Sequence, residues 1–433
     1  MCCRVFASLL VMLLAAAITS SRAFGAEPAQ AFPALEPPFA GRLVGIDREW
    51  NLSFRAENKV RVLAASDLAY WGRHRDVEAG PQFVLADGGV VRADLLLLDE
   101  KQVVLGDATG LGRGLWDEST LPRVAVRGIM LQPPAGQGER DRLWKELSSS
   151  SASEDRLIFS AGESIAGTII SAPKLGRFTP ADVVERGEAF ELLRRGSAEP
   201  VVVPAAKVIA ICFAAGAPAR DASGRLAAWL GLTDGSLVRA AGLSTKGDIV
   251  TVALAAGGEL KTTLTGRDDP EARFWDAIRY IEPASPRVAW LSDQEPVGFK
   301  HIPFVSVSRP FGVDANVLGS RLRCGGAVFR KGLGMPSASR LAYDVSGCRK
   351  FEAEIAIDDA AGLAGSVVFK VVLEAELGNW TTAYESPEVR GGDAPIPVSV
   401  DLKGAGRMAL LVDFADRGDV CDYANWLQAR LVK

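Results

Sequence analysis

The stretch FEAEIAID, residues 351–358, decides the fold of the last third of this 433-residue chain. Its apolar side chains occupy every second position, and the same alternation returns in SVVFKVVLEAEL from Ser366, IPVSVDL from Ile396 and RMALLVDF from Arg407. Successive side chains of a strand point to opposite faces, so a period of two indicates strands with one buried face. We therefore predict an antiparallel β-sandwich over residues 287–433.

The region from about Ala40 to Pro283 is also strand-like, and it repeats itself around Gly-containing turns. Three pieces align, FVLADGGVVRADLLLLDEKQVVL from Phe83, LIFSAGESIAGTIISAP from Leu157 and LGLTDGSLVRAAGLSTKGDIVTVAL from Leu230, and a degenerate copy starts at Gly41 with GRLVGIDREWNLSF. The pieces recur about every seventy residues, longer than common solenoid repeats. The pattern therefore predicts small β-meander units, arranged as separate small barrels or sandwiches.

The chain begins like an exported protein. Arg4 precedes an apolar run, Val5 to Thr19, that is shorter than the roughly 20 residues of a membrane span, and small residues follow it. Residues 1–26 are predicted as a signal peptide, with an uncleaved anchor as the alternative. We expect no membrane span after cleavage and a periplasmic, cell-surface or secreted location.

The predicted organisation after the signal peptide has four parts. A β-rich domain over residues 27–132 precedes a polar, Ser-rich linker over 133–156, in which Arg140 to Leu147 suits a short helix. β-rich repeats over 157–286 and the sandwich over 287–433 complete the chain.

Composition argues against several functional classes. The formal net charge is only −4, without a basic cluster, so nucleic acid is not an expected partner. The chain contains two histidines, His74 and His301, which leaves no material for a His-rich zinc site and few general bases. We predict no enzyme activity, no catalytic residues and no cofactor. A glycosidase needs only two carboxylates, so a hydrolase with its catalytic part in the N-terminal region remains an alternative.

Four cysteines follow the signal peptide, Cys212, Cys324, Cys348 and Cys421. An exported protein can form disulfides, so either one bridge with two free thiols or two bridges fit the sequence.

Several motifs of the last third, in order, resemble one family. They are AWLSDQEPV from Ala289, LGSRLRCGGAVFRKGLGMPSASRLAYDVSG from Leu318, FEAEIAIDDAAG from Phe351 and DVCDYANWLQARLV from Asp419. Together they resemble the NPCBM family of carbohydrate-binding modules. The resemblance implies a galactose-binding-like jelly-roll β-sandwich that binds glycans at one end and accompanies secreted glycosidases.

The chain departs from the family pattern at two places. Where the family usually has Gly-Val-His-Ser, this chain has GMPS, residues 334–337, and where it usually has Asp-His-Ala-Asp/Asn-Trp, this chain has DYANW, residues 422–426. Both motif histidines are missing. The fold does not depend on them, but an inherited sugar specificity does.

Sugar recognition needs an aromatic face and planar polar groups. The following residues offer these types and are the predicted carbohydrate-binding set: Asp358, Asp422, Tyr423, Asn425 and Trp426. Alternatively, Trp426 packs in the core and Asp422 only holds its loop, which leaves Tyr423 as the better stacking residue. The acidic loop residues Asp413, Asp416 and Asp419 could bind Ca²⁺ as a structural ion, or they are simply solvated.

The sequence thus favours an exported, non-catalytic glycan-binding protein. A structural or protein-interaction component of the cell envelope, with a degenerate sugar site, is the second hypothesis.

Overall fold

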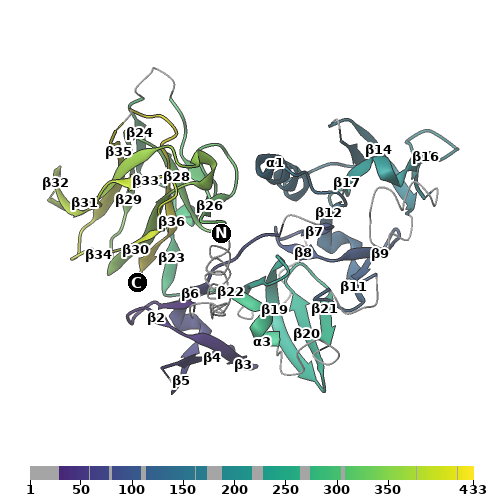
Figure 1. Ribbon diagram of the computed structural model, residues 1–433, viewed down its shortest axis with the longest axis horizontal. Helices are drawn as coiled ribbons and strands as arrows, with labels where there is room; N and C mark the ends of the chain where they lie inside the picture. Colours follow the sequence, from purple (N-terminus) through teal and green to yellow (C-terminus); the bar gives the residue numbers. More distant parts are fainter. Residues whose placement is uncertain are drawn as a thin grey trace, which may run out of the picture.

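The computed structural model describes residues 29–57, 59–77, 80–108, 114–160, 162–172, 188–216, 228–263, 274–303, 308–376, 378–416 and 418–433. The predicted signal peptide lies outside these residues. The fold is mainly β, as predicted, with a C-terminal module at one end and four small N-terminal units beside it (Figure 1). No helix within the described ranges is long and apolar enough to cross a membrane.

The repeats correspond to four units of the same construction. Unit 1 contains β1 (Gln30–Pro33), β2 (Phe39–Ala40), β3 (Arg42–Ile46), β4 (Asn51–Ala56), β5 (Lys59–Ala64), the 3-10 turn η1 (Ala65–Asp67) and β6 (Leu68–Gly72). Unit 2 contains β7 (Gln82–Leu85), β8 (Val90–Arg92), β9 (Asp94–Leu98), β10 (Gln102–Gly106), β11 (Ser119–Pro122), η2 (Arg123–Ala125) and β12 (Val126–Met130).

Units 3 and 4 continue the series. Unit 3 contains β13 (Asp155–Phe159), β14 (Ser164–Ser171), β15 (Ala189–Leu193), β16 (Val201–Pro204), η3 (Ala205–Lys207) and β17 (Val208–Cys212). Unit 4 contains β18 (Ala228–Leu232), β19 (Leu237–Lys246), β20 (Ile249–Leu254), β21 (Glu259–Thr263), the short helix α3 (Phe274–Ala277) and β22 (Ile278–Pro283).

Each unit closes because its last strand pairs with its first. The closing pairs are β6 with β1, β12 with β7, β17 with β13 and β22 with β18, all antiparallel. In units 2 to 4 the hairpin between the first two strands turns at Gly88, Gly162 and Gly235, whose φ angles are 87°, 82° and 90°. Only glycine adopts this backbone region without strain, which explains why the aligned pieces share a glycine there.

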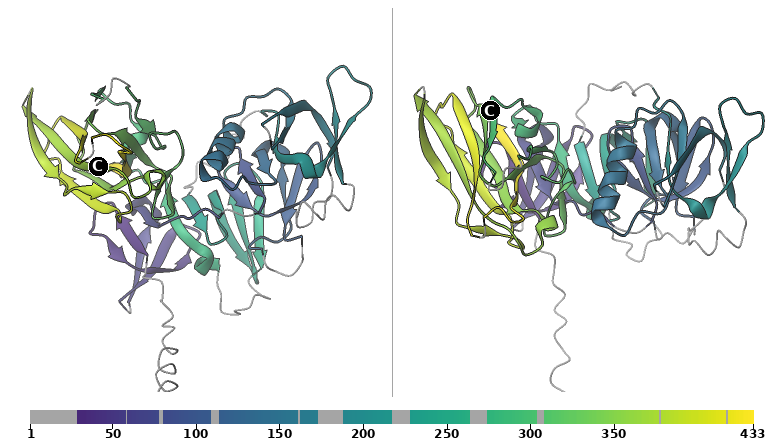
Figure 2. Two further views of the ribbon diagram at one scale, coloured as in Figure 1. Left: turned by 45° about the horizontal axis from the view of Figure 1, so that its top comes forward. Right: turned by 90° about the horizontal axis from the view of Figure 1, so that it is seen from above.

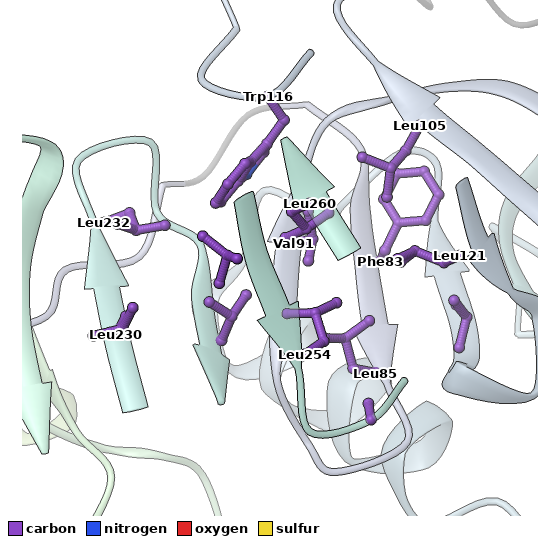
Figure 3. Packing of buried hydrophobic residues seen from close by; sticks show 14 of the residues in the cluster. Phe83, Leu85, Val91, Leu105, Trp116, Leu121, Leu230, Leu232, Leu254 and Leu260 are labelled. Carbon is purple, nitrogen blue, oxygen red and sulfur yellow. The ribbon is translucent and has the colours of Figure 1, made fainter. Parts of the chain in front are cut away.

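The units are not separate domains. Strand β12 also pairs with β17, β8 with β19 and β6 with β22, so the four units share one large sheet. A single hydrophobic cluster runs through all four; Figure 3 shows part of it, including Phe83, Trp116 and Leu230. The predicted division into residues 27–132 and 157–286 is therefore replaced by one continuous β body.

Residues 133–156, predicted as a linker with a short helix at Arg140 to Leu147, contain helix α1 (Gln137–Ser148). Leu143 and Leu147 of α1 are buried against Met130 and Ile158, and Asp155 already belongs to β13. The expected short helix lies inside α1, but it packs on the sheet because its apolar positions fall on one face. The segment connects units 2 and 3 without separating them.

The C-terminal module is the predicted sandwich, with buried apolar side chains such as Phe351, Phe369 and Trp426 between two sheets. One sheet runs β25 (Gly312–Val313), β28 (Gly332–Pro336), β36 (Tyr423–Val432), β30 (Lys350–Ile357) and β34 (Ile396–Asp401), with β23 (Val288–Trp290) on β36. The other runs β24 (Gly298–His301), β29 (Ser339–Asp344), β35 (Arg407–Phe414), β31 (Ser366–Glu376) and β32 (Asn379–Glu385), with β33 (Val389–Arg390) on β31. A hairpin of β26 (Leu322–Cys324) and β27 (Ala327–Phe329) packs on the outer face of β30 and β36, against Ala356 and Leu427.

Cys212, Cys324, Cys348 and Cys421 are all free thiols. Neither pattern of disulfides that the sequence allowed is present.

The module is joined to the N-terminal body through buried charges. Glu354 of β30, 3% exposed, accepts hydrogen bonds from the Tyr70 hydroxyl (2.7 Å) and from Arg73 (2.5 Å). The guanidinium of Arg430 lies 5.1 Å from the centre of the Tyr70 ring, a cation–π distance. The outer face of the β30–β36 sheet is thus covered rather than solvated.

A second group of charges fastens α1 and the β26 hairpin to each other. Asp141 of α1 accepts hydrogen bonds from Arg321 (2.7 Å) and from Arg323, and Asp76 contacts both arginines at 2.7 Å. Arg323 is 2% and Asp141 3% exposed. Both views in Figure 2 place the module and units 2 and 3 at opposite ends of the molecule. The contacts of Asp141 with Arg321 and Arg323 therefore connect these two ends.

Candidate functional site

A pocket of about 330 Å³ opens at one end of the sandwich, between the ends of three strands. Strand β24 ends there at His301, β28 ends at Pro336, and β36 begins at Tyr423. The lining residues are His301, Arg309, Val317, Pro336, Ser337, Asp419, Val420, Cys421, Asp422 and Tyr423. We call this the end pocket.

Two of the five predicted sugar-binding residues line the end pocket. Tyr423 is half-buried, and the register of β36 on β28 places it directly opposite Pro336. Asp422 is 3% exposed and accepts a hydrogen bond from the backbone N–H of Ser366 (2.9 Å). Burial raises the pKa of Asp422 to about 6, and the hydrogen bond from the backbone N–H of Ser366 offsets only part of that rise.

The other three predicted residues lie in the interior. Asp358 is 2% exposed and accepts four hydrogen bonds, from Asn316, Arg323, Ala360 and Asn425. Burial raises its pKa. Four donors occupy the carboxylate, so Asp358 joins the loop at Asn316 to strands β26 and β36 and has no acceptor position left for a ligand. Asn425, 0% exposed, belongs to the same network.

Trp426 is also fully buried. Its ring packs edge-on against Phe369 (5.1 Å between ring centres) and Phe351 (5.8 Å) in the core between the sheets. Trp426, Asn425 and Asp358 therefore expose almost no surface to a sugar, and of the five predicted residues only Asp422 and Tyr423 line the end pocket. For Trp426 the structure matches the core alternative.

His301 is a pocket residue that sequence reasoning did not propose. Its Nδ1 accepts a hydrogen bond from the backbone N–H of Arg309 (3.0 Å), and burial lowers its pKa despite the nearby Asp419. The two missing motif histidines correspond to Pro336 and Tyr423, which line the same pocket. The end pocket therefore contains one histidine, His301 of β24, although neither motif position carries a histidine. The chain contains only two histidines, and this rarity of the residue type was the one sequence feature that could have drawn attention to His301.

The pocket combines accessible polar and apolar groups. Arg309 and Asp419 are exposed. The exposed apolar side chain of Val420 lines the pocket, and those of Ile302 and Leu318 belong to residues next to lining residues in the chain. One cation, one carboxylate and one phenol beside apolar side chains match the polyhydroxylated, partly apolar surface of a sugar. Across the described ranges, no three Cys, His, Asp or Glu side chains gather as a metal site.

Comparison with known proteins supports this class of module. Residues 287–432 match the model of the NPCBM/NEW2 domain family, which confirms the predicted resemblance for the C-terminal third. The last third of the chain is therefore similar to the NPCBM/NEW2 domain family.

Individual relatives are similar over limited ranges. A Renibacterium salmoninarum protein named "Putative endo-alpha-N-acetylgalactosaminidase" is 36% identical over 115 residues, which are 26% of this chain and 7% of that protein. A solved structure of CBM51-2 with GlcNAc and INT domains from Clostridium perfringens ZmpB is 20% identical, with a TM-score of 0.31 over 46% of this chain and 42% of that one. The CBM51 of Clostridium perfringens GH95 with methyl-galactose is 21% identical, with a TM-score of 0.30 over 34% and 99%.

Proposed function

We propose that this is an exported, non-catalytic protein that binds glycans in the end pocket of its C-terminal module. The observation that carries the proposal is the meeting of Tyr423, Asp422, His301 and Arg309 at one end of a sandwich that matches the NPCBM/NEW2 family. The N-terminal body holds the module in place through contacts such as those of Tyr70 and Arg73 with Glu354.

The residues of the pocket divide the work of recognition. The half-buried Tyr423 ring offers a face for the apolar C–H side of a sugar ring, and carboxylate and guanidinium groups offer paired hydrogen bonds to neighbouring hydroxyls. Asp419 is the exposed carboxylate of the pocket, and Arg309 is its exposed guanidinium.

A specific observation favours a second candidate function. Pro336 and Tyr423 of the end pocket occupy the positions of both motif histidines. A module that had given up sugar binding for a structural or protein-interaction role in the cell envelope would also lack these histidines. Glycan binding by the purified protein separates the two candidates.

The test is a glycan array probed with the full chain, with and without calcium. We expect selective binding that Tyr423→Ala weakens by about tenfold or more, because one stacked aromatic ring contributes on the order of 1 kcal/mol and its hydroxyl adds to this. Calcium dependence would support a structural ion in the acidic loops.

Tyr384→Ala is the matched control, since Tyr384 is also half-buried in the module but outside the end pocket. The full chain is required because the interface with the N-terminal body covers charged groups of the module. A folded protein that binds no glycan would instead favour the structural role.

The pH dependence of binding is a further prediction. An ionised carboxylate accepts stronger hydrogen bonds from sugar hydroxyls than the protonated acid does, and burial raises the pKa of Asp422 to about 6. Affinity should therefore rise by on the order of tenfold between pH 5 and pH 7 as Asp422 loses its proton. Calorimetric titration at both pH values measures this change.

Asp422→Asn is expected to flatten that profile while leaving the fold intact, because the amide oxygen still accepts from Ser366. His301 also gains charge at lower pH, so an unchanged profile in Asp422→Asn would assign the effect to His301 and contradict the role given to Asp422.

A further inference from the structure

A second cleft lies where the module meets the N-terminal body. Two cavities, of about 200 Å³ and 560 Å³, share Trp229 and Arg330 and so form neighbouring parts of one cleft. Its walls come from α1 and units 2 and 4 on one side, and from the β27 end and β23 on the other. No residue lines both this junction cleft and the end pocket.

Aromatic side chains form much of the junction cleft. Trp144 of α1 and Trp229 of β18 are half-buried, so part of each indole is accessible, and Phe329 and Trp290 lie deeper. The Arg330 guanidinium lies 5.0 Å from the Trp229 ring centre. Two partly accessible indoles with planar polar groups nearby are a surface suited to pyranose rings.

The charges of the junction cleft balance. Five cationic side chains (Arg92, Arg239, Arg321, Arg330 and Lys331) meet five carboxylates (Asp76, Asp87, Asp314, Glu282 and Asp293). Many pair with one another: Arg330 with Glu282, Arg321 with Asp76 at 2.7 Å, and Lys331 with both Asp293 and Asp314. His74 adds no charge near neutral pH, because burial lowers its pKa to about 4. A cleft without net charge offers no attraction to an anion such as a phosphate or a uronate.

We propose that the junction cleft is a second saccharide-binding site and that it takes several residues of a neutral oligosaccharide. Its two cavities together suit a chain rather than a single sugar, since ligand pockets of about 300–1,000 Å³ enclose drug-sized molecules. Arg330 lies over one face of Trp229 and Arg321 over one face of Trp144 (5.7 Å), so the remaining face of each indole supplies the stacking surface. The ion-paired side chains along the walls supply hydrogen bonds to hydroxyls. The site exists only when module and body are joined.

The test uses the full chain and mass-spectrometric footprinting of indole oxidation. Cellotetraose, chitotetraose, maltotetraose and galactotetraose are the neutral probes, and tetragalacturonate is the anionic comparison. We expect at least one neutral probe to slow oxidation of Trp144 and Trp229 severalfold, with no change at Trp380 of β32, which is half-buried and outside the cleft. This readout needs no variant, so a substitution that fails to fold does not affect it.

Variants then separate this site from the end pocket. Trp144→Leu should weaken binding of the protecting probe by about tenfold. In Tyr423→Ala the protection of Trp144 and Trp229 should persist, even if the end pocket binds no glycan at all. The proposal is overturned if no neutral probe protects the two indoles, if only tetragalacturonate does, or if protection disappears in Tyr423→Ala.

Discussion

Replacing Asp141 with alanine is expected to lower the free energy of unfolding by about 3–5 kcal/mol. The Asp141 carboxylate is buried between Arg321 and Arg323, and its loss leaves the Arg323 guanidinium, 2% exposed, with only Asp76 to balance two positive charges. Urea-induced unfolding measures the change. Limited proteolysis near residues 284–287 should show that the module detaches from the body first.

Asp276→Ala is the matched control for this prediction. Asp276 pairs with Arg42 at 2.7 Å, but the Arg42 side chain is 64% exposed. Exposed pairs contribute about 0–1 kcal/mol, so this variant should be nearly as stable as the parent protein. Equal losses in the two variants would show that burial of the Asp141 group adds nothing.

The same carboxylates make the junction sensitive to acid. Burial alone would raise the pKa values of Asp76 and Asp141, but Arg321 and Arg323 outweigh it and hold both below the usual value. Groups whose folded-state pKa is lowered stabilise the protein above the unfolded pKa, near 3.8, and this contribution is lost as pH falls below it. The junction should therefore be intact at pH 5 and loosen towards pH 3. In Asp141→Ala, unfolding should depend less on pH in this window.

Replacing Trp426 with alanine should cost about 3–5 kcal/mol of stability, because it leaves a large cavity between the two sheets of the module. The indole is fully buried and packs edge-on against Phe351 and Phe369. Thermal unfolding followed by circular dichroism measures the loss.

Trp426→Phe distinguishes packing from sugar contact. It should retain part of the stability and all of the glycan affinity, since the indole never reaches the end pocket. If Trp426→Phe kept its stability but lost glycan binding, Trp426 would be a contact residue and its exclusion from the end pocket would be wrong.

Local patterns predicted much of the fold. The alternation from Phe351 to Ile357 depends only on strand geometry, and the shared turn glycines Gly88, Gly162 and Gly235 depend only on backbone sterics. Each of these signals is contained in a stretch of a few consecutive residues. They therefore indicated the sandwich and the repeats without any knowledge of long-range contacts.

Part of the site was accessible in the same way. Tyr423 and Asp422 belong to one short motif at the start of a strand, and both reach the end pocket. Asn425 and Trp426, from the same motif, do not. Trp426 points into the core between the two sheets, and Asn425 is enclosed through its hydrogen bond to Asp358.

The sequence by itself determined the elements of this protein, namely strands of period two, glycine turns, the repeat and the family motifs, because these are local properties of the chain. Only the tertiary structure decided which strands pair across units, that α1 packs on a shared sheet, that His301 enters the end pocket and that Glu354 is buried under Tyr70. The physical reason is that burial and ion pairing join residues hundreds of positions apart, such as Tyr70 and Glu354 or Asp141 and Arg323. Whether a polar side chain is solvated or enclosed follows from its distant partner and not from its neighbours in sequence.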